Sequence, residues 1–399
     1  MSSADTVPSI RDRIVAVLEG RKPDRLPFCD RLELWHAALI RQGRLPAELE
    51  GLSLTEVHAA VGIGQLKFVA PYALRLRGVE MVVSVDGEEV SRETDPVMER
   101  FPNMQDLVQT DRPGMTAFRF STPVGSLQVR QEVLEEAVAW GEMGYLAEHP
   151  IKGLEDYATV QWILERVELV PQFDKIRQEA AAIGGVGFVT PYLHRIPFQE
   201  VLLDYLGEIP TFYALADEPA RVRALMDALN EVKLETAELL AGLDVPYVQL
   251  FDNLTGDMTD PKLFAEYCLP SYQLYTELYH RQGKKVGSHT DGNLNPLLGL
   301  LRESGLDVCE SFAPAPLSAC TFDEAWEAWR GGTPIMWGVV PSPLLEERTP
   351  ETELKEFVDH VFETVGDEPI ILGVSDMVLG NNLIERVRYV AERVEEHAL

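Results

Sequence analysis

A histidine and two carboxylates follow apolar segments in the second half of the chain. One segment ends in GSHTDGN, which contains His289 and Asp291, and a later one ends in VCESFAPAP, which contains Glu310. If both segments are strands of one parallel barrel, these side chains meet at its carboxyl-terminal mouth, where enzymes of that architecture place their chemistry. An imidazole among carboxylates suits a divalent metal ion or general acid–base catalysis. The competing interpretation is that His289 is a structural histidine and that Glu310 only caps a turn.

Further oxygen and nitrogen donors stand at the ends of other apolar segments. These residues are Asp30, Asp252, Asn253 and Asp376. Together with His289, Asp291 and Glu310, they predict a site for Zn²⁺ or another divalent ion, with an open position for an oxygen atom of a substrate. Spacing alone does not select which carboxylates bind the ion. A metal-free site that uses the same groups as acid and base therefore stays open.

Strand-like and helical segments alternate along most of the chain, which predicts a parallel α/β fold. Buried strands are expected at residues 26–30, 184–190, 246–252, 285–289, 306–311, 334–339 and 369–374, with an eighth at 65–69. Amphipathic helices are expected at residues 219–241, 261–282, 294–303, 321–329, 349–365 and 382–397. Eight such units predict a single TIM (β/α)₈ barrel. Residues 77–134 alternate apolar and polar side chains around turn signals, so we expect an antiparallel β insertion that covers part of the mouth within one domain of residues 1–399.

The charge and composition exclude several functions. The chain has 65 acidic and 35 basic residues, a formal net charge of −30, which repels a nucleic-acid backbone and disfavours anionic membranes. No apolar run approaches the ~20 residues that span a bilayer, and the first residues lack the apolar core of a secretion signal, so we expect a cytoplasmic enzyme. The four cysteines are irregularly spaced and form no metal-binding pair motif. Nucleotide-binding glycine motifs and the GxSxG and HExxH motifs are absent.

Three long stretches resemble the uroporphyrinogen decarboxylase superfamily. They are the opening RDRIVAVLEGRKPDRLPF, the middle FDNLTGDMTDPKLFAEYCLPSYQLYTELYHRQGKKVGSHTDGN and the closing ILGVSDMVLGNNLIERVRYVAERVEEH. The resemblance implies a TIM barrel. It also implies one of two chemistries: cofactor-free decarboxylation of tetrapyrrole acetates, or zinc-dependent methyl transfer that involves a corrinoid protein.

The residues that follow the first strand favour the methyltransferases. Decarboxylases of the superfamily carry an arginine-rich segment there, whereas this chain reads FCDRLELWHAALIRQGRLPAEL, with Asp30, Glu33, Trp35 and His36. A polycarboxylate would meet carboxylates in place of guanidinium groups, which costs several kcal/mol for an uncompensated buried charge. Methyltransferases that use thiols carry a His-x-Cys zinc motif, and the cysteine position is Asp291 here. An oxygen ligand makes a harder, more Lewis-acidic site that suits an oxygen leaving group.

The chain most resembles the substrate-side methyltransferase of corrinoid-dependent O-demethylases, also in WHAALIRQGRLPAELEGLSLTEVHAAVGIG and DVCESFAPAPLSACTFDEAWEAW. This implies transfer of a methyl group from a methoxylated, aromatic small molecule to the cobalt of a separate corrinoid protein. His289 and Glu310 would hold the zinc, with Asp291 or Asp376 as a further ligand or a partner of one. Asp252, with Asn253, would protonate or orient the leaving oxygen. The residues expected to contact the substrate are Asp30, Trp35, His36, Tyr192, His194, Phe251, Phe312 and Trp337.

Two other functions stay open at this point. One is a metal-free decarboxylase or lyase that acts on a small carboxylic acid, and the other is a barrel that serves only as a binding scaffold. No DxHxxG-like segment for a cobalt-binding histidine is present, so the corrinoid is expected on a partner protein. A homodimer is compatible with the sequence.

Overall fold

The computed structural model describes residues 7–108, 110–140 and 143–397. Its centre is a parallel sheet of eight strands in the order β1-β2-β11-β12-β13-β14-β15-β16. Phe28 pairs in parallel with Leu372, which closes the sheet into a barrel between β16 and β1. The strands are β1 Cys29–Asp30, β2 Gly64–Val69, β11 Gly187–His194, β12 Tyr247–Phe251, β13 Lys285–His289, β14 Val308–Phe312, β15 Ile335–Pro341 and β16 Ile371–Ser375. The predicted TIM barrel is confirmed.

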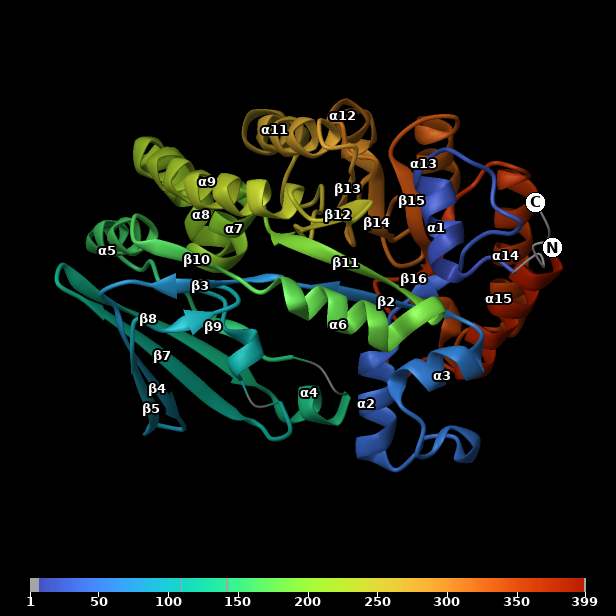
Figure 1. The fold of residues 1–399 in the computed structure, drawn as a ribbon, viewed down its shortest axis with the longest axis horizontal. Helices are drawn as coiled ribbons and strands as arrows, with labels where there is room; N and C mark the ends of the chain where they lie inside the picture. Colours follow the sequence, from blue (N-terminus) through green and yellow to red (C-terminus); the bar gives the residue numbers. More distant parts are fainter. Residues whose placement is uncertain (1–6, 109, 141–142, 398–399) are drawn as a thin grey trace, which may run out of the picture.

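Helices surround the barrel between successive strands (Figure 1). They include α1 Ile10–Leu18, α2 Glu33–Gln42, α3 Leu54–Val61, α6 Phe173–Ile183, α7 Pro197–Glu200, α8 Glu208–Asp217, α9 Pro219–Ala241, α10 Pro261–Leu263, α11 Leu269–His280, α12 Leu298–Glu303, α13 Phe322–Trp329, α14 Glu351–Val365 and α15 Ile384–Glu396. Capping boxes fix the starts of α1 at Ser9, of α3 at Ser53 and of α13 at Thr321. The helix predicted at 261–282 is interrupted by a π turn at Phe264–Cys268. Pro270 has no N–H to continue a regular ladder there.

The interior of the barrel is filled by aromatic side chains. Phe188, Tyr247 and Trp337 are almost fully buried, and their ring centroids lie 5.9 to 6.2 Å apart. Helix α1 packs against the same cluster through Ile14 and Val17. The barrel is therefore a packed core, and its chemistry is confined to the mouth.

The antiparallel insertion lies between β2 and β11. A five-stranded sheet has the order β5-β4-β7-β8-β9, and a three-stranded sheet has the order β10-β3-β6. Their bounds are β3 Tyr72–Leu76, β4 Glu80–Val85, β5 Glu88–Thr94, β6 Val97–Met98, β7 Gly114–Thr122, β8 Gly125–Val133, β9 Tyr145–Glu148 and β10 Val167–Pro171, with helices α4 Glu135–Trp140 and α5 Leu154–Leu164. The insertion extends beyond the predicted 77–134, because its later part consists of short strands and a helix without clear alternation.

The insertion sits at the end of the barrel where β2 and β11 finish, whereas α1 lies at the other end (Figure 1). It has an apolar core of its own, in which Phe118, Phe120 and Val129 pack with Val201 and Tyr205 from the segment after β11. Within the described residues, no helix is long and apolar enough to cross a membrane.

Candidate metal centre

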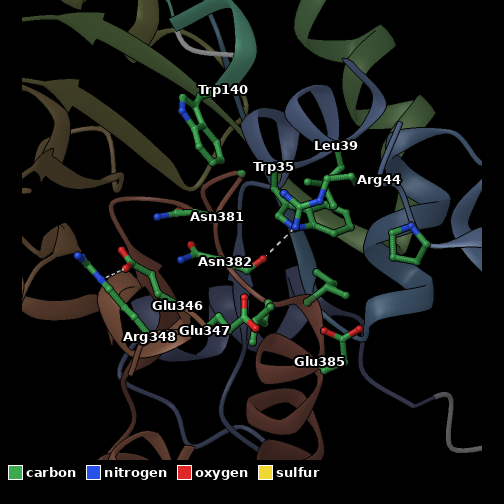
Figure 2. Close-up of a pocket in the computed structure, with 14 residues that line it drawn as sticks. Trp35, Leu39, Arg44, Trp140, Glu346, Glu347, Arg348, Asn381, Asn382 and Glu385 are labelled. Carbon is green, nitrogen blue, oxygen red and sulfur yellow. Dashed lines mark hydrogen bonds and ion pairs between the residues drawn. The ribbon is translucent and has the colours of Figure 1, made fainter. Parts of the chain in front are cut away.

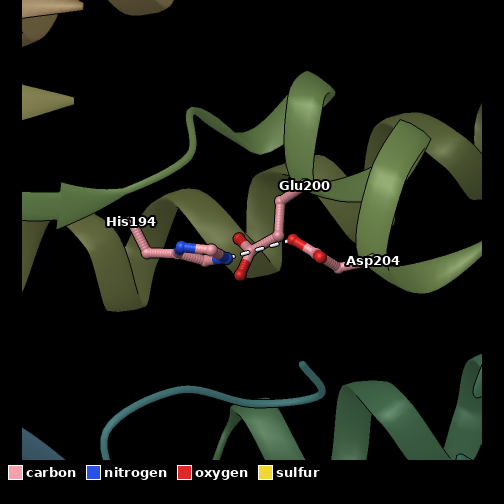
Figure 3. Close-up of side chains that lie close together, drawn as sticks. All are labelled: His194, Glu200 and Asp204. Atoms are coloured by element: carbon pink, nitrogen blue, oxygen red, sulfur yellow. Dashed lines mark hydrogen bonds and ion pairs between the residues drawn. The ribbon is translucent and has the colours of Figure 1, made fainter. Parts of the chain in front are cut away.

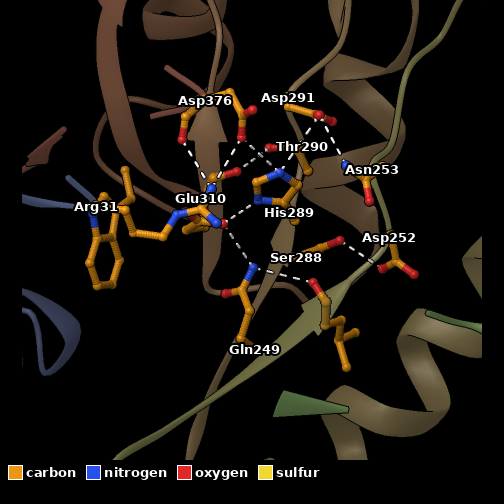
Figure 4. Close-up of polar contacts among 12 residues, drawn as sticks. Arg31, Gln249, Asp252, Asn253, Ser288, His289, Thr290, Asp291, Glu310 and Asp376 are labelled. Carbon is orange, nitrogen blue, oxygen red and sulfur yellow. Dashed lines mark hydrogen bonds and ion pairs between the residues drawn. The ribbon is translucent and has the colours of Figure 1, made fainter. Parts of the chain in front are cut away.

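His289 is the last residue of β13, and its side chain stands among three carboxylates at the barrel mouth (Figure 4). The parallel register pairs His289 with Glu310 of β14, and Nδ1 of the imidazole lies 2.6 Å from Glu310 Oε2. The other ring nitrogen, Nε2, lies 3.3 Å from Asp376 Oδ1 and 3.6 Å from Asp291 Oδ2. The two ring nitrogens of His289 thus face different carboxylates: Nδ1 faces Glu310, and Nε2 faces Asp376 and Asp291.

The spacing around Nε2 fits a small metal ion. Zinc ligands at about 2.0–2.1 Å in tetrahedral geometry lie roughly 3.3 Å from one another. The nitrogen of His289 and one oxygen each of Asp291 and Asp376 approach this spacing, and the three atoms lie within 4.8 Å of one another. Glu310 is on the opposite side of the ring. It therefore occupies the place of a carboxylate that orients a ligating histidine, and does not share the side of the ring that Asp291 and Asp376 face.

The charges of this group are strongly coupled. Burial by itself lowers the pKa of His289, but the carboxylates of Glu310 and Asp291 outweigh it and hold that pKa well above its usual value. Burial raises the pKa of Asp376, but His289 and Arg31 lower it to about 2. Three carboxylates thus face one imidazole and one guanidinium, and a divalent cation in place of the imidazolium proton would make the group neutral.

Hydrogen bonds hold each carboxylate in place. Gln249 Nε2 donates to Glu310 Oε2 at 3.1 Å. Arg31 Nη2 donates to both the backbone oxygen and Oδ1 of Asp376, each at 3.2 Å. Asn253 Nδ2 donates to Asp291 Oδ2 at 3.1 Å. The site is thereby preorganised by neighbours from β1, β12 and the loop after β12.

Aromatic rings lie beside the histidine. Phe251 packs edge-on toward His289, with 6.3 Å between ring centroids, and stacks on Tyr192 at 4.3 Å. Phe68 meets Phe251 in a T-shaped contact at 4.7 Å, and Arg31 lies over the Phe68 ring. A cavity of about 460 Å³ opens next to this group. It is lined by Asn253, Thr255, Asp257, Asp291, Gly292, Asn293, Leu317, Ser318 and Asp376.

Asp252, for which a catalytic role was predicted, is enclosed by hydrogen-bond donors. It is fully buried, and its oxygens accept hydrogen bonds from the backbone of Ile196 at 2.7 Å, from Ser288 at 2.7 Å and from Tyr272 at 2.9 Å. Burial raises its pKa, and the three donors oppose that rise. A carboxylate enclosed by donors in this way ties together the ends of β11, β12 and β13 and helix α11.

Several residues predicted to contact the substrate have other surroundings. Trp337 fills the barrel interior and donates to the backbone of Cys29 at 2.9 Å. Phe312 is fully buried against Trp329 of α13. Asp30 is buried and accepts from the backbone of Arg31 and of Val374. These three side chains are packed into the barrel wall or interior. The sequence did not indicate this, because strands buried on both faces give no sign of which residues point toward the mouth.

Trp35 and His36 belong to α2, away from the residues around His289. Trp35 is buried and donates to the backbone of Asn382 at 3.2 Å. Figure 2 shows that it borders a separate cavity, of about 630 Å³, together with Trp140 and Asn381. His36 is half-buried, and its Nε2 has no hydrogen-bond partner among the described residues. His194 lies in another buried group with Glu200 and Asp204 (Figure 3).

Of the predicted substrate contacts, Tyr192 and Phe251 are the two that lie against the histidine group. Phe68 and Gln249 also belong to the site, although they were not selected from the sequence. The sequence does hold a signal for Gln249, which is a polar residue inside the apolar strand Tyr247–Phe251. For Phe68 the signal is its place next to the end of the eighth predicted strand.

A family model matches the part of the chain that carries these residues. Residues 210–397, which carry β12 to β16 and all three carboxylates around His289, match the family model described as uroporphyrinogen decarboxylase (URO-D). The match supports the uroporphyrinogen decarboxylase superfamily over these residues, which are a little under half of the chain. No curated protein sequence matches the chain.

One solved structure resembles the fold of the chain over nearly its whole length. A methyltransferase from Methanosarcina mazei matches 98% of this chain and 99% of its own length, with a TM-score of 0.59 and 12% sequence identity. At that identity the match supports a shared fold. A GH2 beta-galacturonidase from Eisenbergiella tayi, bound to glycerol, matches 81% of this chain with a TM-score of 0.29 and 9% identity, too low to inform the function.

Proposed function

We propose that the chain is a zinc-dependent methyltransferase that moves a methyl group from a methoxylated aromatic compound to the cobalt of a separate corrinoid protein. The observation that carries the proposal is the placement of Nε2 of His289 beside Asp291 and Asp376, with Phe251 next to the ring. The structural likeness to a methyltransferase supports the same reaction class.

The donor set suits this reaction. When a methyl group leaves an aryl ether, the carbon–oxygen bond breaks and its electron pair stays on the oxygen, so positive charge is needed at that atom. Zinc bound by Nε2 of His289 and by oxygens of Asp291 and Asp376 would supply Lewis acidity there. All three are nitrogen or oxygen donors, which agrees with an oxygen leaving group.

The other residues position the ligands and the ring. Glu310 accepts from Nδ1 of His289, which leaves Nε2 with its lone pair directed toward Asp291 and Asp376. Phe251, which stacks on the buried Tyr192, offers an apolar ring beside the group, against which an aromatic ring can pack. We reassign Glu310 from ligand to orienting partner, and we no longer assign a proton transfer to Asp252.

Zinc content tests the proposal most directly. Purified protein is expected to hold about one zinc per chain. His289→Ala, Asp291→Ala and Asp376→Ala should each lose it, whereas Asp257→Asn, a carboxylate of the same cavity outside the group, should keep it. Wild-type protein that binds no zinc would contradict the proposal.

A methyl-transfer assay then tests the substrate class. Methoxybenzenes or methoxyphenols are expected to methylate reduced cobalamin in the presence of the protein, as followed by its absorption spectrum. The metal-free lyase remains the second candidate, because Nε of the half-buried Arg31 at this site has no hydrogen-bond partner among the described residues, and it could bind one carboxylate of a substrate. Turnover of a carboxylic acid by zinc-free protein, without methyl transfer, would favour it.

A further inference from the structure

A second group of buried charges lies beyond the metal centre. His194, Glu200 and Asp204 bring three potential ligand atoms within 4.8 Å of one another (Figure 3). Two cations already neutralise this group, because Lys233 Nζ lies 2.6 Å from Glu200 and Arg195 Nη1 lies 3.1 Å from Asp204. His194 Nε2 also lies 3.0 Å from Asp204. With its carboxylates paired to protein cations, the group suits an anchor for Arg195 better than a metal site.

Arg195 connects this anchor to the metal centre. Its Nη1 donates to Asp204, and its Nη2 donates to Asn253 Oδ1 at 2.9 Å. Asn253 Nδ2 then donates to Asp291 Oδ2 at 3.1 Å, the same oxygen that lies 3.6 Å from His289 Nε2 (Figure 4). An unbroken series of contacts therefore runs from Asp204 to the imidazole.

The chemistry of the neighbours fixes the direction of the Asn253 amide. A guanidinium has donors and no acceptor, so the amide oxygen must face Arg195. An ionised carboxylate accepts and does not donate, so the amide nitrogen must face Asp291. Rotating the amide by half a turn would place donor against donor and acceptor against acceptor. Arg195 thus determines which atom of Asn253 meets Asp291.

The backbone at Asn253 supports a dedicated role for this residue. Its φ is +52°, a left-handed conformation that asparagine and glycine adopt more readily than other residues. The turn occurs directly after β12, where the chain leaves the barrel wall. It carries the amide across to Asp291, which follows the neighbouring strand β13.

The series of contacts continues into the insertion. Asp204 also accepts from Asn103 Nδ2 at 3.0 Å, and Asn103 Oδ1 accepts from Gln131 Nε2 at 2.9 Å. Gln131 belongs to β8 of the five-stranded sheet. The side chains of Gln131, Asn103 and Asp204 are all buried, so water does not replace these contacts readily.

We propose that Arg195 and Asn253 are positioning residues that hold the carboxylate of Asp291 for metal binding, and that Asp204 anchors them to the insertion. This rests on the proposed metal-binding function. The position of Asp291, however, can be observed in protein without metal.

The test is Asn253→Gly, which removes the amide and tolerates the positive φ. In a crystal structure of the metal-free variant, the Asp291 carboxylate is expected to leave its position beside His289. Zinc affinity, measured by competition with a chromogenic chelator, is expected to fall about 10- to 100-fold. Arg195→Lys keeps a charge for Asp204 but loses the two-branched guanidinium, and it should weaken zinc binding in the same direction.

Asn230→Ala is the matched control. It removes a hydrogen bond of 2.7 Å from Tyr275 between α9 and α11, outside the series of contacts, and should leave zinc affinity unchanged. An unmoved Asp291, or an unchanged zinc affinity, in folded Asn253→Gly and Arg195→Lys would overturn the inference. If wild-type protein binds no zinc but Asp291 still moves in the variants, the metal-binding function fails and the positioning role stands.

Discussion

The two ring nitrogens of His289 have different partners, so replacing a residue on either side should have different consequences. Glu310→Gln is nearly isosteric and removes the charge that faces Nδ1 at 2.6 Å. Loss of a carboxylate behind a ligating histidine typically weakens metal binding by about 10- to 100-fold, or roughly 1.4–2.7 kcal/mol. Asp376→Ala and His289→Ala each remove a proposed ligand atom, Oδ1 of Asp376 or Nε2 of His289, and should abolish stoichiometric zinc binding. The order of affinities therefore reports which side of the ring the metal occupies.

The assay is a competitive titration of zinc against a chromogenic chelator at fixed pH, with the thermal unfolding of each variant recorded alongside. Asp257→Asn controls for the loss of one negative charge in the same cavity. Glu310→Gln that loses zinc as completely as His289→Ala would show that Glu310 is a direct ligand. Wild-type affinity in Glu310→Gln would refute the argument that this carboxylate prepares the histidine.

Three further predictions concern the aromatic surface, the strand beneath the site and the distant charge group. Phe251→Leu should raise the KM for methoxylated aromatic substrates by about fivefold while zinc content stays unchanged, since stacking contributes on the order of 1 kcal/mol. Equal kinetics would remove Phe251 from the substrate surface. Gly287→Ala should lower stability by about 1–3 kcal/mol in thermal unfolding, because an added Cβ would lie 1.8 Å from the Tyr247 hydroxyl. Burial raises the pKa of Glu200 to about 7, although Lys233 opposes the rise. Between pH 4.5 and 7, Glu200 therefore keeps its proton in the folded protein and loses it in the unfolded chain. The free energy of unfolding of the wild type, measured with urea, should fall by on the order of 3 kcal/mol relative to Glu200→Gln over this pH range. A difference between the two proteins that does not change with pH would contradict this.

The architecture could be predicted because the strands and helices have strong local signals. Continuous apolar segments between amphipathic helices identified every barrel strand, and Lys285–His289 and Pro219–Ala241 match their predicted bounds. Strand ends also indicated which polar residues gather at the mouth. Parallel strands all finish at one end of a barrel, so this inference needs no knowledge of side-chain orientation.

The sequence could not predict the direction in which each side chain points. Glu310 and Asp376 both follow from strand ends, but only the register between β13 and β14 places Glu310 on the Nδ1 side of His289. Asp252 has the same local pattern as Asp291, yet it is enclosed by donors from three segments far apart in the chain. Trp337 lies in a strand that is buried on both faces, where alternation does not distinguish the inside from the outside.

Closure of the barrel depends on few backbone contacts. Strand β1 has two residues, and the parallel pair that connects this segment to β16, Phe28 with Leu372, lies just before it. Across this seam Arg31 donates to both the backbone and the side chain of Asp376, 345 positions away in sequence. An ion held by Asp376 would therefore act directly on the seam where the first and last strands meet. Ligand occupancy and the integrity of the barrel become thermodynamically linked, so that chelation would loosen the fold first at the junction of the two ends of the chain.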